Sequence, residues 1–99
     1  MWHSVGKIQD VENGKSLILD LSGKRVALFK IEDQFYAIEN TCPHRGGPLG
    51  EGEVGGMQVT CPWHAWTFDL KTGSCVNIPG NKIKTFPVKI EKEEILIEV

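Results

Sequence analysis

Alternating apolar and polar side chains occupy much of the first forty residues. This period of two is typical of β-strands, and it covers the segments 17–21, 25–32 and 35–39. The turn-forming pair Ser22-Gly23 separates the first two segments, and a turn at Asp33-Gln34 separates the last two. We therefore predict an antiparallel meander in this part of the chain.

The C-terminal region returns to the same pattern. Segments 85–91 and 94–99 alternate well, and the polar pair Lys92-Glu93 between them predicts a turn. No segment of the chain has a convincing helical period. The predicted fold is therefore all-β, an antiparallel β-sandwich.

The window from about residue 40 to residue 80 has a different amino-acid composition. It contains four of the five prolines and eight of the eleven glycines, which are too many turn formers for long regular elements. Short strand candidates remain at 57–60 and 66–70, and they could pair as a small hairpin. We expect a loop-rich insertion that carries the chemistry, because functional residues concentrate on loops held by a rigid scaffold.

Composition narrows the class of protein. The chain has 99 residues, 40% hydrophobic and 24% charged, which predicts one folded domain over residues 1–99. A formal net charge of −2 without a Lys/Arg cluster argues against a nucleic-acid partner. No segment approaches the roughly 18 apolar residues of a membrane helix, and residues 1–10 lack a signal-peptide pattern. We expect a soluble cytoplasmic protein without a membrane partner.

Two mixed pairs of metal-binding residues stand within the insertion. Cys42 and His44 flank one residue, and Cys61 and His64 flank two, so each loop offers one thiolate and one imidazole. Ligands this close on a tight turn can point to the same side and reach adjacent metal atoms. A structural zinc site would use the same four residues, and buried cysteines and histidines without a metal are a further alternative.

Glycines follow the first of these pairs closely. Gly46, Gly47 and Gly50 permit positive φ values and a close approach of the backbone to neighbouring groups. We expect them to let backbone amides point at the sulfur atoms of the site.

The segments around the two pairs resemble a known family. CPHRGGPL at 42–49 and CPWHAWTFDLKTG at 61–73 resemble the two cluster-binding boxes of the Rieske family, and the rest of the chain resembles a complete Rieske ferredoxin. The resemblance implies one [2Fe-2S] cluster, with Cys42 and Cys61 on one iron and His44 and His64 on the other. Zinc fits less well, because zinc fingers usually keep like ligands together.

Departures from the high-potential respiratory members of the family bear on the reduction potential. Those members have hydroxyl donors at the positions of Trp66 and Phe68, and a disulfide at the positions of Gly47 and Trp63. Without these features, the resemblance implies a potential of roughly −150 mV rather than +300 mV.

The expected partners follow from that low potential. The resemblance implies a ferredoxin that takes electrons from an NAD(P)H-dependent flavoprotein reductase and passes them to a ring-hydroxylating dioxygenase or a similar terminal oxygenase. It would be a monomer when isolated. The alternative is the small Rieske-like subunit of an assimilatory nitrite reductase.

The remaining candidate residues argue against an active site in this chain. Rieske oxygenases use a separate iron held by two histidines and a carboxylate, and here only His3 remains outside the two pairs. We expect an electron-transfer component, not an enzyme. Cys75 and Trp2 are expected in the core, and Ala65 replaces the glycine usual after the second histidine, which matters if that position needs a positive φ.

Overall fold

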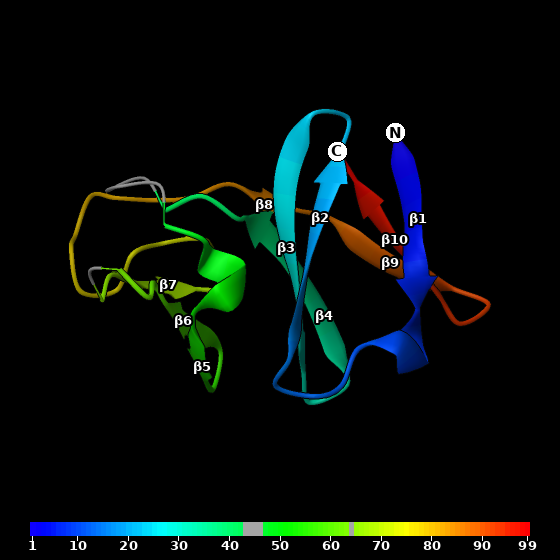
Figure 1. The fold of residues 1–99 in the computed structure, drawn as a ribbon, viewed down its shortest axis with the longest axis horizontal. Coiled ribbons are helices and arrows are strands. Elements are labelled where there is room, and N and C mark those ends of the chain that lie inside the picture. Colours follow the sequence, from blue (N-terminus) through cyan, green and yellow to red (C-terminus); the bar gives the residue numbers. More distant parts are fainter. Residues whose placement is uncertain (43–46, 64) are drawn as a thin grey trace.

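The structure is a computed structural model that describes residues 1–42, 47–63 and 65–99. Within these residues the chain forms ten strands in three sheets, two short 3₁₀ turns and no α-helix (Figure 1). All strand pairs are antiparallel, which confirms the predicted all-β fold. The described residues include no helix long and apolar enough to cross a membrane.

The predicted meander forms the central sheet. Its strands, in spatial order, are β2 (Ser16–Leu21), β3 (Lys24–Ile31), β4 (Gln34–Glu39) and β8 (Thr85–Phe86). The predicted turn at Ser22-Gly23 is confirmed. The second turn lies one residue earlier than predicted, at Glu32 and Asp33, because Ile31 still pairs with Gln34.

The terminal strands form a second sheet. Its spatial order is β1 (Trp2–Lys7), β10 (Glu94–Glu98) and β9 (Val88–Glu91). The predicted continuous strand 85–91 is wrong, since it divides at Pro87 into β8 and β9, which belong to different sheets. Proline has no backbone N–H for the ladder, so this residue suits the crossing point.

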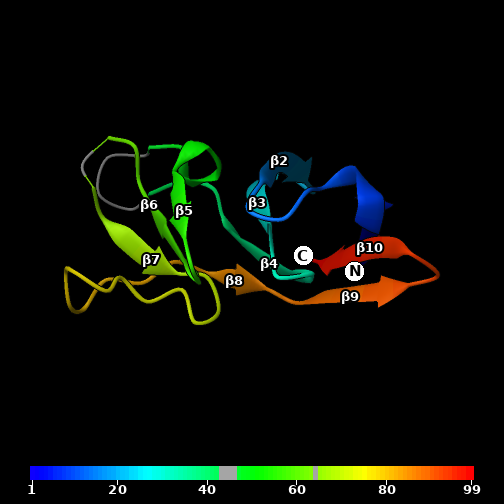
Figure 2. The ribbon, with the colours of Figure 1, turned by 90° about the horizontal axis from the view of Figure 1, so that it is seen from below.

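The loop-rich window contains the third sheet. It consists of β5 (Glu53–Gly55), β6 (Gln58–Thr60) and β7 (Thr67–Asp69), with the 3₁₀ turn η2 (Leu49–Glu51) before it. The predicted pairing of 57–60 with 66–70 is confirmed, whereas β5 was not predicted. Figures 1 and 2 both place this sheet at one end of the molecule, away from β1, β9 and β10.

Strand β3 lies between two clusters of the described core. Ala27, Phe29 and Ile31 belong to the cluster that covers the loop-rich side, and Val26 and Leu28 belong to the cluster shared with the terminal strands. Successive side chains of a strand point to opposite faces, so β3 is buried on both faces. The central sheet therefore supports the loop-rich region directly.

The structure tests the predictions that Cys75 and Trp2 lie in the core. Cys75 is buried in the cluster on the loop-rich side, as predicted. Trp2 is not in the core, because its side chain is 37% exposed and the Lys89 Nζ lies 4.4 Å from the centre of its ring. Trp2 lies in β1, a strand at the edge of its sheet.

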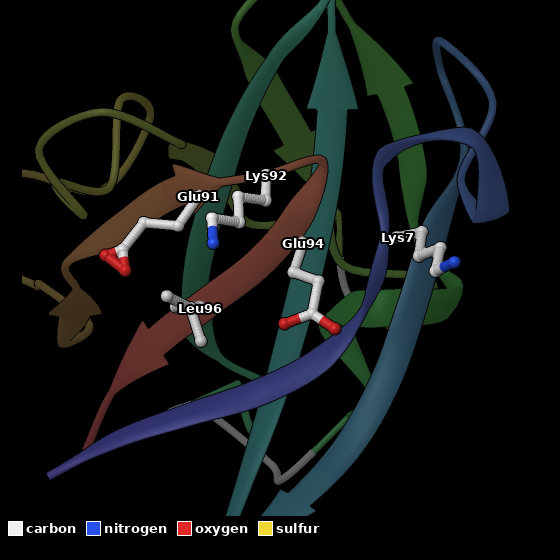
Figure 3. Close-up of a pocket in the computed structure, with 5 residues that line it drawn as sticks. All are labelled: Lys7, Glu91, Lys92, Glu94 and Leu96. Atoms are coloured by element: carbon white, nitrogen blue, oxygen red, sulfur yellow. The ribbon is translucent and has the colours of Figure 1, made fainter.

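The 3₁₀ turn η1 (Ile8–Asp10) follows β1. An open surface depression of about 770 Å³ lies at the end of β1, beside the turn between β9 and β10. Figure 3 shows its lining residues, which are Lys7, Glu91, Lys92, Glu94 and Leu96. They come from β1, from β9 and β10 and from the turn between those two strands, and none comes from the window 40–80. Charged side chains on an open surface are ordinarily solvated, so we assign this depression no chemistry.

Candidate metal centre

The two predicted cysteine ligands lie in the same part of the core. Cys42 is 1% exposed and Cys61 is 3% exposed, and both belong to the core cluster on the loop-rich side. His44 and His64 lie outside the described residues, so their places in the ligand set stay predictions. The structure thus brings the two cysteine-bearing loops together.

Asn40 holds the ends of the first loop. Its side-chain Oδ1 accepts a hydrogen bond of 2.7 Å from the Gly50 N–H, and its backbone oxygen accepts one of 2.6 Å from the Leu49 N–H. Farther in, the Cys42 N–H donates to the Gly47 oxygen at 2.9 Å. Asn40 is only 4% exposed, so these bonds lie in a low-dielectric environment that strengthens them. The loop that carries Cys42 is therefore closed firmly onto the end of β4.

The second loop joins β6 to β7. The Cys61 N–H donates to the Trp66 oxygen at 2.8 Å, and the Ala65 N–H donates to the Cys61 oxygen at 3.2 Å. Ala65 has a φ of +59°, so this position does need the left-handed conformation. A residue with a Cβ pays about 1 kcal/mol for that conformation, which glycine adopts without strain.

Gly47 lies where described residues of the two loops touch. A Cβ at this position would lie 2.7 Å from the Cys61 Sγ and 3.2 Å from the Trp63 ring. Real Cβ atoms do not come this close to a sulfur atom, so this loop packing requires glycine. Trp63 therefore packs against Gly47. By the family resemblance, the high-potential members have a disulfide between these two positions.

The glycine predictions for the first loop are confirmed in part. Gly47 and Gly50 both lie closer to their neighbours than a Cβ would allow, as expected for a close backbone approach. Neither has a positive φ, so their role is to leave space rather than to permit a special backbone conformation. Gly46 lies outside the described residues.

Asn77 ties a third segment to the second loop. Its side chain hydrogen bonds to the backbone of Ala65 and Thr67 and to the Cys75 thiol. Sequence reasoning missed both Asn77 and Asn40, because the partners of a single asparagine are set by tertiary contacts. The many prolines and glycines of the window 40–80 predicted only loops in this part of the chain.

The two predicted ligands that the structure describes, Cys42 and Cys61, suit a soft metal ion. Two buried cysteines belong to one otherwise apolar cluster, and no Cβ fits where Gly47 faces the Cys61 sulfur. Thiolates select zinc, Cu(I) and iron–sulfur clusters over hard cations such as Mg²⁺. These residues therefore fit the cysteine side of a Rieske cluster.

Comparison with known proteins identifies the family. Residues 1–87 match the Rieske [2Fe-2S] domain. The chain therefore belongs to the Rieske [2Fe-2S] domain family. This confirms the predicted cofactor class of one Rieske cluster and sets aside the zinc and metal-free alternatives.

Two relatives illustrate the range of proteins that contain this domain. The ferredoxin component of the naphthalene 1,2-dioxygenase/salicylate 5-hydroxylase systems of Ralstonia sp. is 32% identical over 99 residues, which cover 99% of this chain and 95% of that protein. Apoptosis-inducing factor 3 of Mus musculus is 38% identical over 95 residues, which cover 95% of this chain. The chain spans only 16% of the length of that second relative.

Solved structures agree with the sequence relatives. The ferredoxin in a complex of reduced oxygenase and oxidized ferredoxin of carbazole 1,9a-dioxygenase matches with a TM-score of 0.91 and 28% identity, over 97% of this chain and 100% of that chain. A proposed NADH-dependent nitrite reductase small subunit from Mycobacterium tuberculosis matches with a TM-score of 0.92 and 25% identity, over 98% and 93% of the two chains. The chain is thus homologous to dioxygenase ferredoxin components and similar in fold to the nitrite reductase subunit.

Proposed function

We propose that this chain is a Rieske ferredoxin that carries single electrons from an NAD(P)H-dependent flavoprotein reductase to a terminal oxygenase. Cys42, His44, Cys61 and His64 would hold its cluster. The observation that carries the proposal is that two buried cysteines from two loops belong to one core cluster, with Gly47 against the Cys61 sulfur. When bound, a cluster of this type accepts and releases one electron at a potential set by its ligands and surroundings.

The chain's own residues would shield such a cluster from water. Leu49 and Phe68 are fully buried in the same cluster of side chains as both cysteines, and Trp66 packs against it. Low polarity around a metal centre tunes its reduction potential and limits solvent access. The protein therefore surrounds the cysteine side of the site with buried apolar side chains.

Exposed apolar side chains on the neighbouring loops provide a surface for partners. Trp63 is 57% exposed, Val76 48% and Ile78 37%. Trp63 packs on Gly47, while Val76 and Ile78 flank Asn77, whose side chain bonds to the second loop. Weak electron-transfer encounters bury little surface, so a small apolar patch around the site is suited to brief contacts. We propose that reductase and oxygenase both contact this patch.

The ligand set can be tested against built-in controls. Replacing any one of Cys42, Cys61, His44 or His64 with alanine should abolish the bound iron–sulfur cluster, measured as iron and sulfide per chain. The third cysteine and the third histidine serve as matched controls, so Cys75→Ala and His3→Ala should keep full occupancy. Full occupancy after loss of one proposed ligand would remove that residue from the set.

The small-subunit alternative is favoured by one observation, the TM-score of 0.92 with the Mycobacterium tuberculosis protein. A permanent subunit would co-purify in a stable complex with its large subunit. The proposed carrier, which we expect in the cytoplasm, should instead be a monomer when isolated. Light scattering of the protein purified from its native source distinguishes the two. Turnover of a purified oxygenase with NADH, reductase and this chain would then support the ferredoxin role.

A further inference from the structure

The segment after β7 continues the small sheet by pairing with that strand. The Asp69 N–H donates to the Ser74 oxygen at 2.9 Å, and the Val76 N–H donates to the Thr67 oxygen at 2.8 Å. The chain then reaches Ile78 and Pro79, where this backbone pairing ends. At the start of β7, the Thr67 N–H donates to the side chain of Asn77 instead of to the backbone.

The Asn77 amide uses both its acceptor and its donor. Its Oδ1 accepts from the Thr67 N–H at 3.1 Å and from the Cys75 Sγ at 3.3 Å. Its Nδ2 donates to the Ala65 oxygen at 2.9 Å. Among short side chains only asparagine offers an amide donor and a carbonyl acceptor together, since aspartate lacks the donor and leucine lacks both.

These bonds act on a residue of the second loop that has a left-handed backbone conformation. Ala65 has a φ of +59°, and it is joined to His64 by the peptide bond. The Asn77 amide bonds on both sides of Trp66, to the oxygen of residue 65 and to the N–H of residue 67. It therefore bridges the stretch of chain that leads from His64 back into β7.

We propose that Asn77 is a positioning residue, whose amide holds Ala65 in its left-handed conformation and so fixes the backbone that directly follows His64 in the sequence. The inference rests on the proposed cluster, because His64 matters here only as a ligand. Asn77 acts through Ala65 and does not touch the metal. Its loss should therefore alter the site without removing any ligand.

The test compares two asparagines of the same segment. Asn77→Ala removes the bridge, whereas Asn81→Ala removes a side chain whose one hydrogen bond to the described residues stays within its own loop, to the Ile78 oxygen at 3.3 Å. Asn77→Ala loses three hydrogen bonds, two of them exposed and one partly buried, and this should speed release of the cluster to an iron chelator by about threefold to tenfold. Asn77→Ala should also shift the EPR g values and the reduction potential, and Asn81→Ala should leave all three readouts at the wild-type values.

A double-mutant cycle with Ala65→Gly separates positioning from general destabilisation. Glycine adopts the left-handed conformation without strain, so Asn77→Ala should have a clearly smaller effect when it is combined with Ala65→Gly. If Asn77→Ala does not give folded protein, Asn77→Asp replaces it. That variant keeps the acceptor but loses the donor to Ala65, and it should also release the cluster faster than wild type.

The outcomes distinguish this inference from the proposed function. Wild-type protein without a Rieske EPR signal would overturn both. A wild-type signal together with equal behaviour of Asn77→Ala and Asn81→Ala would overturn the positioning role alone. An Asn77→Ala effect of the same size with and without the Ala65→Gly substitution would also overturn it, since the bridge would then not act through Ala65.

Discussion

At the residue scale, the site depends on a few contacts that only certain side chains permit. The cysteine–histidine spacing and the glycines after Cys42 were enough to predict the two loops and the close approach at Gly47. The sequence did not indicate Asn40 or Asn77, because each is a single polar residue whose partners are far along the chain. Asn40 bonds across ten residues and Asn77 across twelve.

Gly47→Ala should reduce cluster incorporation severely. The added Cβ would lie 2.7 Å from the Cys61 sulfur, so either the loop or the ligand must move. The ratio of cluster absorbance to protein after anaerobic reconstitution measures the effect. Gly55→Ala is the control, because a Cβ there meets nothing within 4 Å. Equal loading of the two variants would contradict the proposed packing of the loops.

At the element scale, alternation predicted the long strands well and the short ones poorly. Strands β2, β3 and β4 have enough residues for the period of two to be visible. Strand β5 has three residues in a glycine-rich stretch, so its pairing depends on β6 rather than on its own pattern. The division at Pro87 depends on which sheet each half joins, and this is a tertiary property that alternation does not reveal.

Substitutions in the turn between β9 and β10 should increase the stability of the folded protein. Lys92 and Glu93 have φ values of +49° and +68°, the signature of a tight hairpin turn that favours Asn-Gly. The double substitution Lys92→Asn, Glu93→Gly should therefore stabilise the protein by about 1 kcal/mol. For a domain of this size, that gain raises the thermal midpoint by about 4–8 °C.

Circular dichroism at matched protein concentrations measures this shift. Lys92→Ala, Glu93→Ala is the matched control, because alanine keeps the Cβ and should not raise the midpoint. An unchanged or lower midpoint for the Asn-Gly variant would show that these φ values do not cost stability.

At the scale of the whole molecule, the central sheet separates two regions with different roles. The terminal strands cover one of its faces, and the loop-rich region with both cysteines packs on the other. The exposed apolar residues proposed to meet partners belong to the loop-rich region, whereas the charged depression of Figure 3 belongs to the terminal strands. Electron transfer should therefore be sensitive to surface changes in only one of these regions.

Ile78→Glu should slow electron delivery to the oxygenase while the reduction potential stays near the wild-type value. The added charge would have to be desolvated in the contact, which weakens the encounter. Ile90→Glu is the matched control, since Ile90 is also an exposed isoleucine but lies on β9. Stopped-flow oxidation of the reduced protein by its oxygenase measures both rates. Equal slowing by the two variants would place the contact elsewhere.

The most direct test of the proposed function is an EPR spectrum of the dithionite-reduced protein, with voltammetry on the same sample. We expect an asymmetric signal whose average g value lies below that of the free electron, and a potential near roughly −150 mV. A silent spectrum with one zinc per chain would contradict the electron-transfer role. A Rieske signal with a potential above about +100 mV would keep the cluster but contradict the proposed low-potential partners.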